Sequence, residues 1–134
     1  MAFDPSTLGG SRILIANDEW FLAAYISEAV ASAGGVALGP VPTVGAALEL
    51  ITSEQPDAVT LNVKLRDECS YSVADKLAEQ GIPFVFVAAA AVTLPVRLSH
   101  ISLLTKPFAA YQVVAALDRS LKQRLTSGPM VRGH

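Results

Sequence analysis

The chain has 134 residues, of which 51% are hydrophobic and only 16% are charged, and its formal net charge is −2. This length suits one domain whose core requires neither disulfides nor a metal. A near-neutral balance without clustered Lys and Arg argues against nucleic-acid binding.

Cys69 is the single cysteine, so an internal disulfide is excluded and a reducing compartment is the natural setting. The first five residues lack the basic region and apolar core of a signal peptide. The longest uncharged stretch, residues 29–48, contains four Gly and two Pro, which is wrong for a membrane span. We therefore expect a soluble, cytoplasmic protein without membrane contact.

The first third of the chain predicts a strand followed by a helix. Residues 1–10 form a polar, Gly-ended lead, and residues 12–16 form an apolar run typical of a strand buried on both faces. Asn17-Asp18-Glu19 then supplies acceptors and negative charge suited to a helix start. Apolar residues recur at helical spacing over 21–33, and Gly34-Gly35 ends that helix.

The next segments repeat this alternation. Residues 36–38 indicate a second strand, and Thr43 can cap a helix over 44–53. Residues 58–62 indicate a third strand, which a charged loop over 64–70 follows.

A third helix is expected from Ser70 or Tyr71 to near Gly81, and a fourth strand over 84–87. Residues 89–99 are ambiguous: the run of four alanines over 88–91 favours helix, but Pro95 allows at most a short turn after it.

The remaining segments complete one domain, expected over 11–125. Residues 101–105 predict a fifth strand and 108–125 an amphipathic helix, followed by a flexible tail over 126–134. Five apolar strands alternating with helices indicate an α/β fold with a parallel sheet covered on both faces. Right-handed crossovers favour the flavodoxin-like, doubly wound order 2-1-3-4-5, with a short or irregular fourth helix.

In this architecture functional residues gather at the carboxyl ends of the strands. Those ends carry Asn17-Asp18-Glu19, Asn62, Ala88 and Lys106. No Gly-rich phosphate loop follows the first strand, which disfavours a nucleotide- or flavin-binding enzyme on this fold.

Three segments resemble the receiver domain of two-component response regulators. They are residues 13–19, 56–62 and 104–108, and the Lys106-Pro107 pair after the fifth strand is the most specific feature. Residues 81–86 are also similar to the approach to the fourth strand in single-domain members. The resemblance covers roughly residues 11–123.

The resemblance implies a phosphorylation site that this chain has mostly lost. Receivers place an acidic pair after the first strand to hold a divalent metal, and the matching residues here are Asn17 and Asp18. The phosphoacceptor Asp becomes Asn62, the hydroxyl position becomes Ala88, and only Lys106 is retained.

The aromatic residue that partners the hydroxyl in the switch becomes Leu103. A carboxamide cannot accept a phosphoryl group as a carboxylate does, and it is a poor Mg²⁺ ligand. The sequence therefore looks like a pseudo-receiver with no metal, cofactor or enzymatic activity, in which Lys106 pairs mainly with Asp18.

Several apolar residues are candidates for a partner surface. Trp20 suits either partial burial or a partner anchor, and the stretch after the fourth strand suits either the core or a contact patch. The candidates are Trp20, Ala91, Val92, Leu94, Val96 and Tyr111.

The expected function is signal transduction by phosphorylation-independent binding to a protein. The partner would be a histidine kinase, a phosphotransfer protein or another regulator, or a second copy docked through the fourth-helix, fifth-strand and last-helix face. The alternative is an active receiver that takes phosphate on Asp18 or Glu19.

Overall fold

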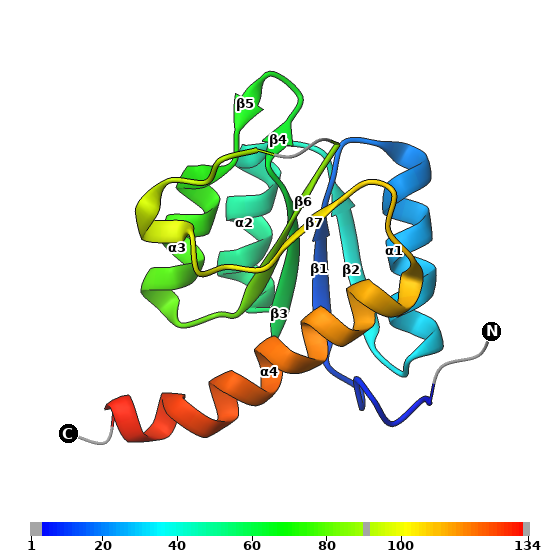
Figure 1. The fold of residues 1–134 in the computed structure, drawn as a ribbon, viewed down its shortest axis with the longest axis vertical. Helices are drawn as coiled ribbons and strands as arrows, with labels where there is room; N and C mark the ends of the chain where they lie inside the picture. The colour runs from blue at the N-terminus through cyan, green and yellow to red at the C-terminus, as the bar shows by residue number, and fades with distance from the viewer. Residues whose placement is uncertain (1–3, 90–91, 133–134) are drawn as a thin grey trace.

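Five parallel strands form the central sheet of the computed structural model, which describes residues 4–89 and 92–132, with side chains as far as Arg124. The sheet has the order β2-β1-β3-β6-β7, which is the expected 2-1-3-4-5 when only its own strands are counted (Figure 1). The strands are β1 (Arg12–Ala16), β2 (Val36–Val41), β3 (Ala58–Asn62), β6 (Phe84–Ala88) and β7 (Leu103–Thr105). The predicted flavodoxin-like fold is confirmed.

Helices cover both faces of this sheet. α1 (Trp20–Ser32) and α4 (Ala110–Arg132) pack on one face, and α2 (Val44–Glu54) and α3 (Tyr71–Gln80) pack on the other (Figure 1). Because side chains alternate along a strand, Ile13 and Ile15 of β1 face α1 while Leu14 and Ala16 face α2. Two apolar cores therefore hold the strands, which explains why the strands read as continuous apolar runs.

The connections differ in regularity. The charged loop after β3 is a small hairpin of β4 (Lys64–Leu65) and β5 (Glu68–Cys69), at the carboxyl end of the sheet. The expected fourth helix is reduced to the 3₁₀ turn η1 (Val96–Leu98), directly after Pro95 as predicted. Arg97 of this turn donates two hydrogen bonds to the Asp75 carboxylate of α3, at 2.9 and 3.0 Å, and they lower the pKa of Asp75.

Three boundaries differ from the sequence expectation. β2 continues through Gly39-Pro40 to Val41, because an edge strand tolerates a proline that donates no hydrogen bond. β7 begins at Leu103, two residues late. α4 continues past the expected end at residue 125 to Arg132, although this extension contains Gly128 and Pro129, which are poor helix formers.

The N-terminal lead is part of the fold. Leu8 is 2% exposed and lies in the core between the sheet and α1, and its N–H donates to the Ala33 carbonyl at 2.9 Å. Gly34 has a φ of +86° and a Cβ there would lie 1.7 Å from the Pro5 carbonyl oxygen, so only glycine permits this approach. The lead thus closes the C-terminal end of α1.

We predict that Leu8→Ala lowers the free energy of unfolding by about 2–5 kcal/mol, because it leaves a cavity in a closed core. Urea denaturation followed by circular dichroism measures this. Val36→Ala is the control, since Val36 is 48% exposed on an edge strand. Equal stability of Leu8→Ala and the control would contradict the packing of the lead.

Candidate functional site

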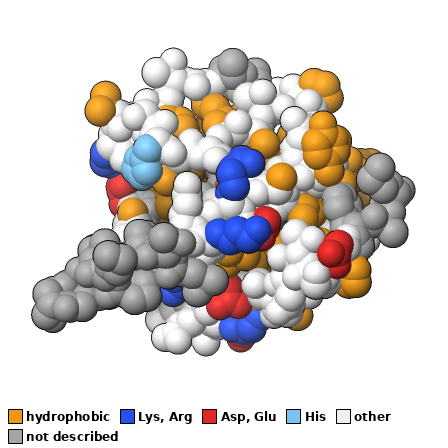
Figure 2. All heavy atoms as spheres, turned by 60° about the horizontal axis from the view of Figure 1, so that its bottom comes forward, with side chains coloured by type: hydrophobic (Ala, Val, Ile, Leu, Met, Phe, Trp, Pro, Cys, Tyr) orange, Lys and Arg blue, Asp and Glu red, His pale blue; other side chains and the backbone are white. Residues whose placement is uncertain are grey.

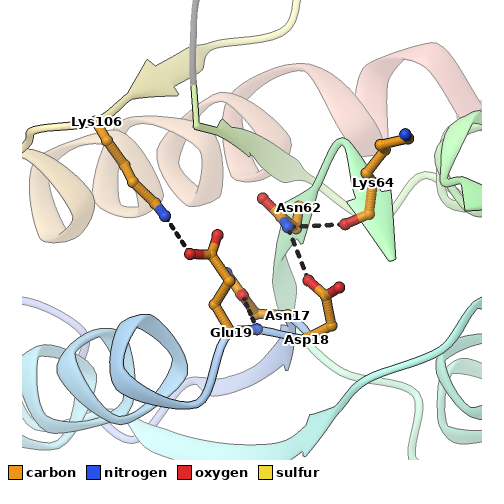
Figure 3. Close-up of polar contacts among 6 residues, drawn as sticks. All are labelled: Asn17, Asp18, Glu19, Asn62, Lys64 and Lys106. Carbon is orange, nitrogen blue, oxygen red and sulfur yellow. Dashed lines mark hydrogen bonds and ion pairs between the residues drawn. The ribbon is translucent and has the colours of Figure 1, made fainter. Parts of the chain in front are cut away.

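Polar side chains from β1, β3 and the β7–α4 loop meet at the carboxyl end of the sheet (Figure 3). Asn17, Asp18 and Glu19 follow β1, Asn62 ends β3, and Lys106 follows β7. The topology therefore brings together the residues that the strand-end argument selected. Ala88, at the end of β6, lies beside Lys106, whose N–H donates to the Ala88 carbonyl at 3.1 Å.

Asn62 links the β1–α1 loop to the hairpin. Its side chain is 6% exposed, and its Nδ2 donates to Asp18 Oδ1 at 3.2 Å and to the Lys64 carbonyl at 2.7 Å. The second carboxylate oxygen of Asp18 accepts from the Arg66 N–H at 2.8 Å. The amide nitrogen therefore lies between two oxygens and donates to both. It does not neutralise the charge of the Asp18 carboxylate, because an amide carries no formal charge.

Asn17 turns its amide nitrogen inward. Its Oδ1 accepts from the Glu19 N–H at 2.9 Å, which fixes the orientation of the carboxamide because a backbone N–H requires an acceptor. The Nδ2 group then lies buried and has no hydrogen-bond partner within the described part of the chain. The helix start is thus capped by Asn17 rather than by the N-cap residue Glu19, whose side chain makes no cap bond.

Lys106 pairs with Glu19, and the expected pairing with Asp18 is wrong. The ammonium group donates to Glu19 Oε1, and the Lys106 and Glu19 side chains keep 31% and 43% of their accessible surface. Asp18 faces the other way because Asn62 and the Arg66 N–H hold both of its oxygens. Asp18 and Glu19 are adjacent in the chain, and only the direction of each side chain gives them different partners.

The residues at the two switch positions are apolar and packed. Ala88 is 4% exposed and belongs to the core on the α2 and α3 side of the sheet. Leu103 is partly buried against the same core. Neither residue has a hydroxyl or an aromatic ring that could move in response to a charge in the crevice.

Solved structures identify this arrangement. The response regulator PhyR from Brucella abortus is 27% identical over 93% of this chain, with a TM-score of 0.78. The receiver domain of a putative Luxo repressor protein from Vibrio parahaemolyticus is 25% identical over 93% of this chain and 99% of its own, with a TM-score of 0.74. The chain therefore has the fold of response-regulator receiver domains and is similar to them.

SdrG from Sphingomonas melonis Fr1 is 33% identical over 84% of this chain and 97% of its own, with a TM-score of 0.76. The receiver described here spans only 53% of the length of the PhyR chain that it matches. No protein-family model and no curated protein sequence matches it. Within the described ranges, no helix combines the length and hydropathy that a bilayer crossing requires.

The residues of this receiver do not fit the divalent cation that receivers hold. Mg²⁺ prefers oxygen ligands with carboxylate charge. Here Asn62 directs an N–H group at Asp18, and Asn17 buries a second N–H₂ group. Among the described residues, no three His, Cys, Asp or Glu side chains are grouped so that they could hold a metal.

Sequence reasoning missed two groups that shape the crevice. Ser70 is fully buried, and its hydroxyl lies 2.6 Å from the Asn62 carbonyl and 3.0 Å from the Val63 carbonyl, so it fixes the start of α3 to the end of β3. The Arg66 backbone N–H binds Asp18 because Arg66 has a φ of +58°, which turns the hairpin back toward the crevice. Backbone donors have no residue-specific signal in a sequence.

The candidate partner residues fall on two separate surfaces. Trp20 and Tyr111 are 72% and 62% exposed and lie on α1 and α4. Val92 and Val96 are 40% and 90% exposed and lie in the segment around η1, which packs on the α3 side. Leu94 is partly buried against the core, and Ala91 lies outside the described residues.

The exposed aromatic side chains of α1 and α4 form one surface, which we call the aromatic face. It consists of Trp20, Phe21, Tyr25 and Tyr111. Phe21 is 81% exposed because the buried stripe of α1 runs through Ala23, Ile26, Ala29 and Val30. The Trp20 and Phe21 rings pack edge to face, with 4.8 Å between their centroids.

Tyr25 joins the two helices of this face, since its hydroxyl accepts from the Ala110 N–H at 2.8 Å. Tyr111 follows directly, at the start of α4. In Figure 2 hydrophobic side chains are exposed along the flank where α1 lies.

We predict that Lys106 is energetically coupled to Glu19 and not to Asp18. A double-mutant cycle of Lys106→Met with Glu19→Gln should give a coupling of about 0.2–1 kcal/mol, the usual range for partly exposed pairs. High salt should reduce it. The matched cycle with Asp18→Asn should give a coupling near zero by urea denaturation, and a larger coupling there would restore the pairing expected from the sequence.

Proposed function

We propose that this receiver is an atypical response regulator that signals by binding a protein partner without being phosphorylated. The observation that carries the proposal is the Asn62 side chain, which occupies the end of the central strand and donates to Asp18 and Lys64. A phosphoacceptor needs a free, ionised oxygen at this point. Asn62 has no ionisable oxygen.

The surrounding residues support the same proposal. Phosphorylation would have to be reported by a hydroxyl moving toward the new charge, but Ala88 offers only a buried methyl group and Leu103 is an aliphatic side chain partly buried against the core. A phosphoryl group would then have no contact that favours one conformation of the surface over another. We also propose that the chain catalyses no reaction of its own.

The alternative, phosphate transfer to Asp18 or Glu19, is less well supported by the contacts. Both carboxylate oxygens of Asp18 accept hydrogen bonds, and Glu19 is paired with Lys106. Attack by either carboxylate would first break these contacts. The alternative is therefore an outcome of the phosphorylation test below.

The aromatic face is the surface that we propose for partner binding. Exposed Trp and Tyr side chains supply much of the energy at protein interfaces, because they bury a large area at a small entropy cost. Isolated exposed apolar residues need no explanation, but four neighbouring aromatic residues do. A histidine kinase, a phosphotransfer protein or another regulator would be the partner, and a second copy of this chain is the competing one.

We predict that acetyl phosphate with Mg²⁺ leaves the intact mass of the protein unchanged. The physical reason is the absence of an ionised oxygen at position 62. An active receiver treated in parallel is the positive control. An acyl phosphate on Asp18 or Glu19 would establish the alternative.

We predict that Trp20→Ala together with Phe21→Ala weakens binding of a partner isolated from the native cell by about tenfold or more, the loss expected for interface anchors. Calorimetric titration measures the Kd. Val92→Ala with Val96→Ala is the matched control, because it also removes two exposed apolar side chains but on the η1 surface. If the control weakens binding and the aromatic variant does not, the η1 surface is the interface.

A further inference from the structure

We infer that the Asn62 carboxamide takes the structural place of a bound cation in this receiver, so that its crevice is held closed without metal. The inference rests on the proposed function, because both depend on Asn62 not being a carboxylate. It goes further because it assigns the amide a structural role. The amide joins oxygens that would otherwise repel one another.

Three chain segments meet at the Asn62 nitrogen. Asp18 comes from the β1–α1 loop, Lys64 from the hairpin and Asn62 from β3. The nitrogen lies 3.2 Å from the Asp18 carboxylate oxygen and 2.7 Å from the Lys64 carbonyl oxygen. Each of the two amide hydrogens can therefore serve one oxygen, which is complete use of this donor.

An aspartate at position 62 would replace this donor with an acceptor. Its oxygen would lie where the nitrogen is, within hydrogen-bond distance of two oxygens and without a hydrogen to share. Two carboxylates and a carbonyl would then converge on one point. Such a group of oxygens is stable only when a cation or a proton lies among them.

The bridge fixes the position of the hairpin. Asp18 also accepts from the Arg66 N–H, so the amide and the carboxylate together hold β4 and the turn that follows it against the β1–α1 loop. Asn17, in the same β1–α1 loop, buries a second N–H₂ group, which cannot act as a cation ligand. The amides at positions 17 and 62 thus both disfavour a cation, although one follows β1 and the other ends β3.

The test compares Asn62→Asp with the unaltered chain by thermal unfolding, in EDTA and in millimolar Mg²⁺. In EDTA we expect the Tm of Asn62→Asp to fall by about 5 °C or more, the shift that one lost buried hydrogen bond and a repulsion produce at this size. Mg²⁺ should restore several degrees to this variant and leave the unaltered chain unchanged. Ca²⁺ should not change the unaltered chain either.

Two controls keep the result interpretable. Asn62→Ala removes the donor without adding charge, so it should be destabilised but insensitive to Mg²⁺. Asp18→Asn combined with Asn62→Asp exchanges donor and acceptor, since the amide at 18 can donate to the carboxylate at 62. This swapped variant should be more stable in EDTA than Asn62→Asp and should not respond to Mg²⁺.

The swapped variant also decides the question if Asn62→Asp alone does not fold. Folding of the swapped variant in EDTA supports the inference, and failure of both variants to fold, with or without Mg²⁺, overturns it. The inference is likewise overturned if Asn62→Asp is as stable as the unaltered chain in EDTA, or if Mg²⁺ raises the Tm of the unaltered chain by several degrees. An unaltered chain that takes no phosphate while Asn62→Asp keeps full stability overturns this inference alone. Phosphorylation of the unaltered chain overturns the proposed function instead.

Discussion

A single side-chain amide at the end of the central strand connects three parts of this receiver. The Asn62 side chain donates to a carboxylate from the β1–α1 loop and to a backbone carbonyl of the hairpin, both joined in this way to β3. The backbone carbonyl of Asn62 separately accepts from the Ser70 hydroxyl at the start of α3. Because β3 is the middle strand of the sheet, a contact made there positions the loops on both sides of it. The interaction is local, and it holds the β1–α1 loop and the hairpin against the end of β3.

The remaining polar residues of the crevice follow from this arrangement. Both carboxylate oxygens of Asp18 accept hydrogen bonds, one from Asn62 and one from the Arg66 N–H. Glu19 is therefore the anion that pairs with Lys106. Two acidic groups and one cation are thus divided into one ion pair and one hydrogen-bonded carboxylate. A receiver that binds Mg²⁺ would need more carboxylates at the same place. Asn17, Asn62 and Ala88 are therefore mutually compatible with the proposed function, since none of them supplies a carboxylate or a hydroxyl to a metal or a phosphoryl group.

The crevice and the proposed binding surface are linked through α1. Trp20 begins the helix directly after Asp18 and Glu19, so the loop that Asn62 holds also sets where the aromatic face begins. The tyrosine in the middle of that face binds the backbone at the start of α4, which follows the loop carrying Lys106. The contacts of Asn62 and Tyr25 thus connect the crevice to the proposed binding surface.

Much of this protein was determined by local sequence patterns. The apolar runs and their spacing predicted every strand of the main sheet and the order of those strands, because burial on both faces leaves few parallel topologies. The strand-end rule also selected the residues of the crevice, since parallel strands all end at one edge. The choice between Asp18 and Glu19 as partner of Lys106, the exposure of Phe21 and the docking of Leu8 were decided by the tertiary structure alone. Each depends on side-chain direction or on a backbone donor from a distant segment, and neither quantity is encoded in residue type or spacing.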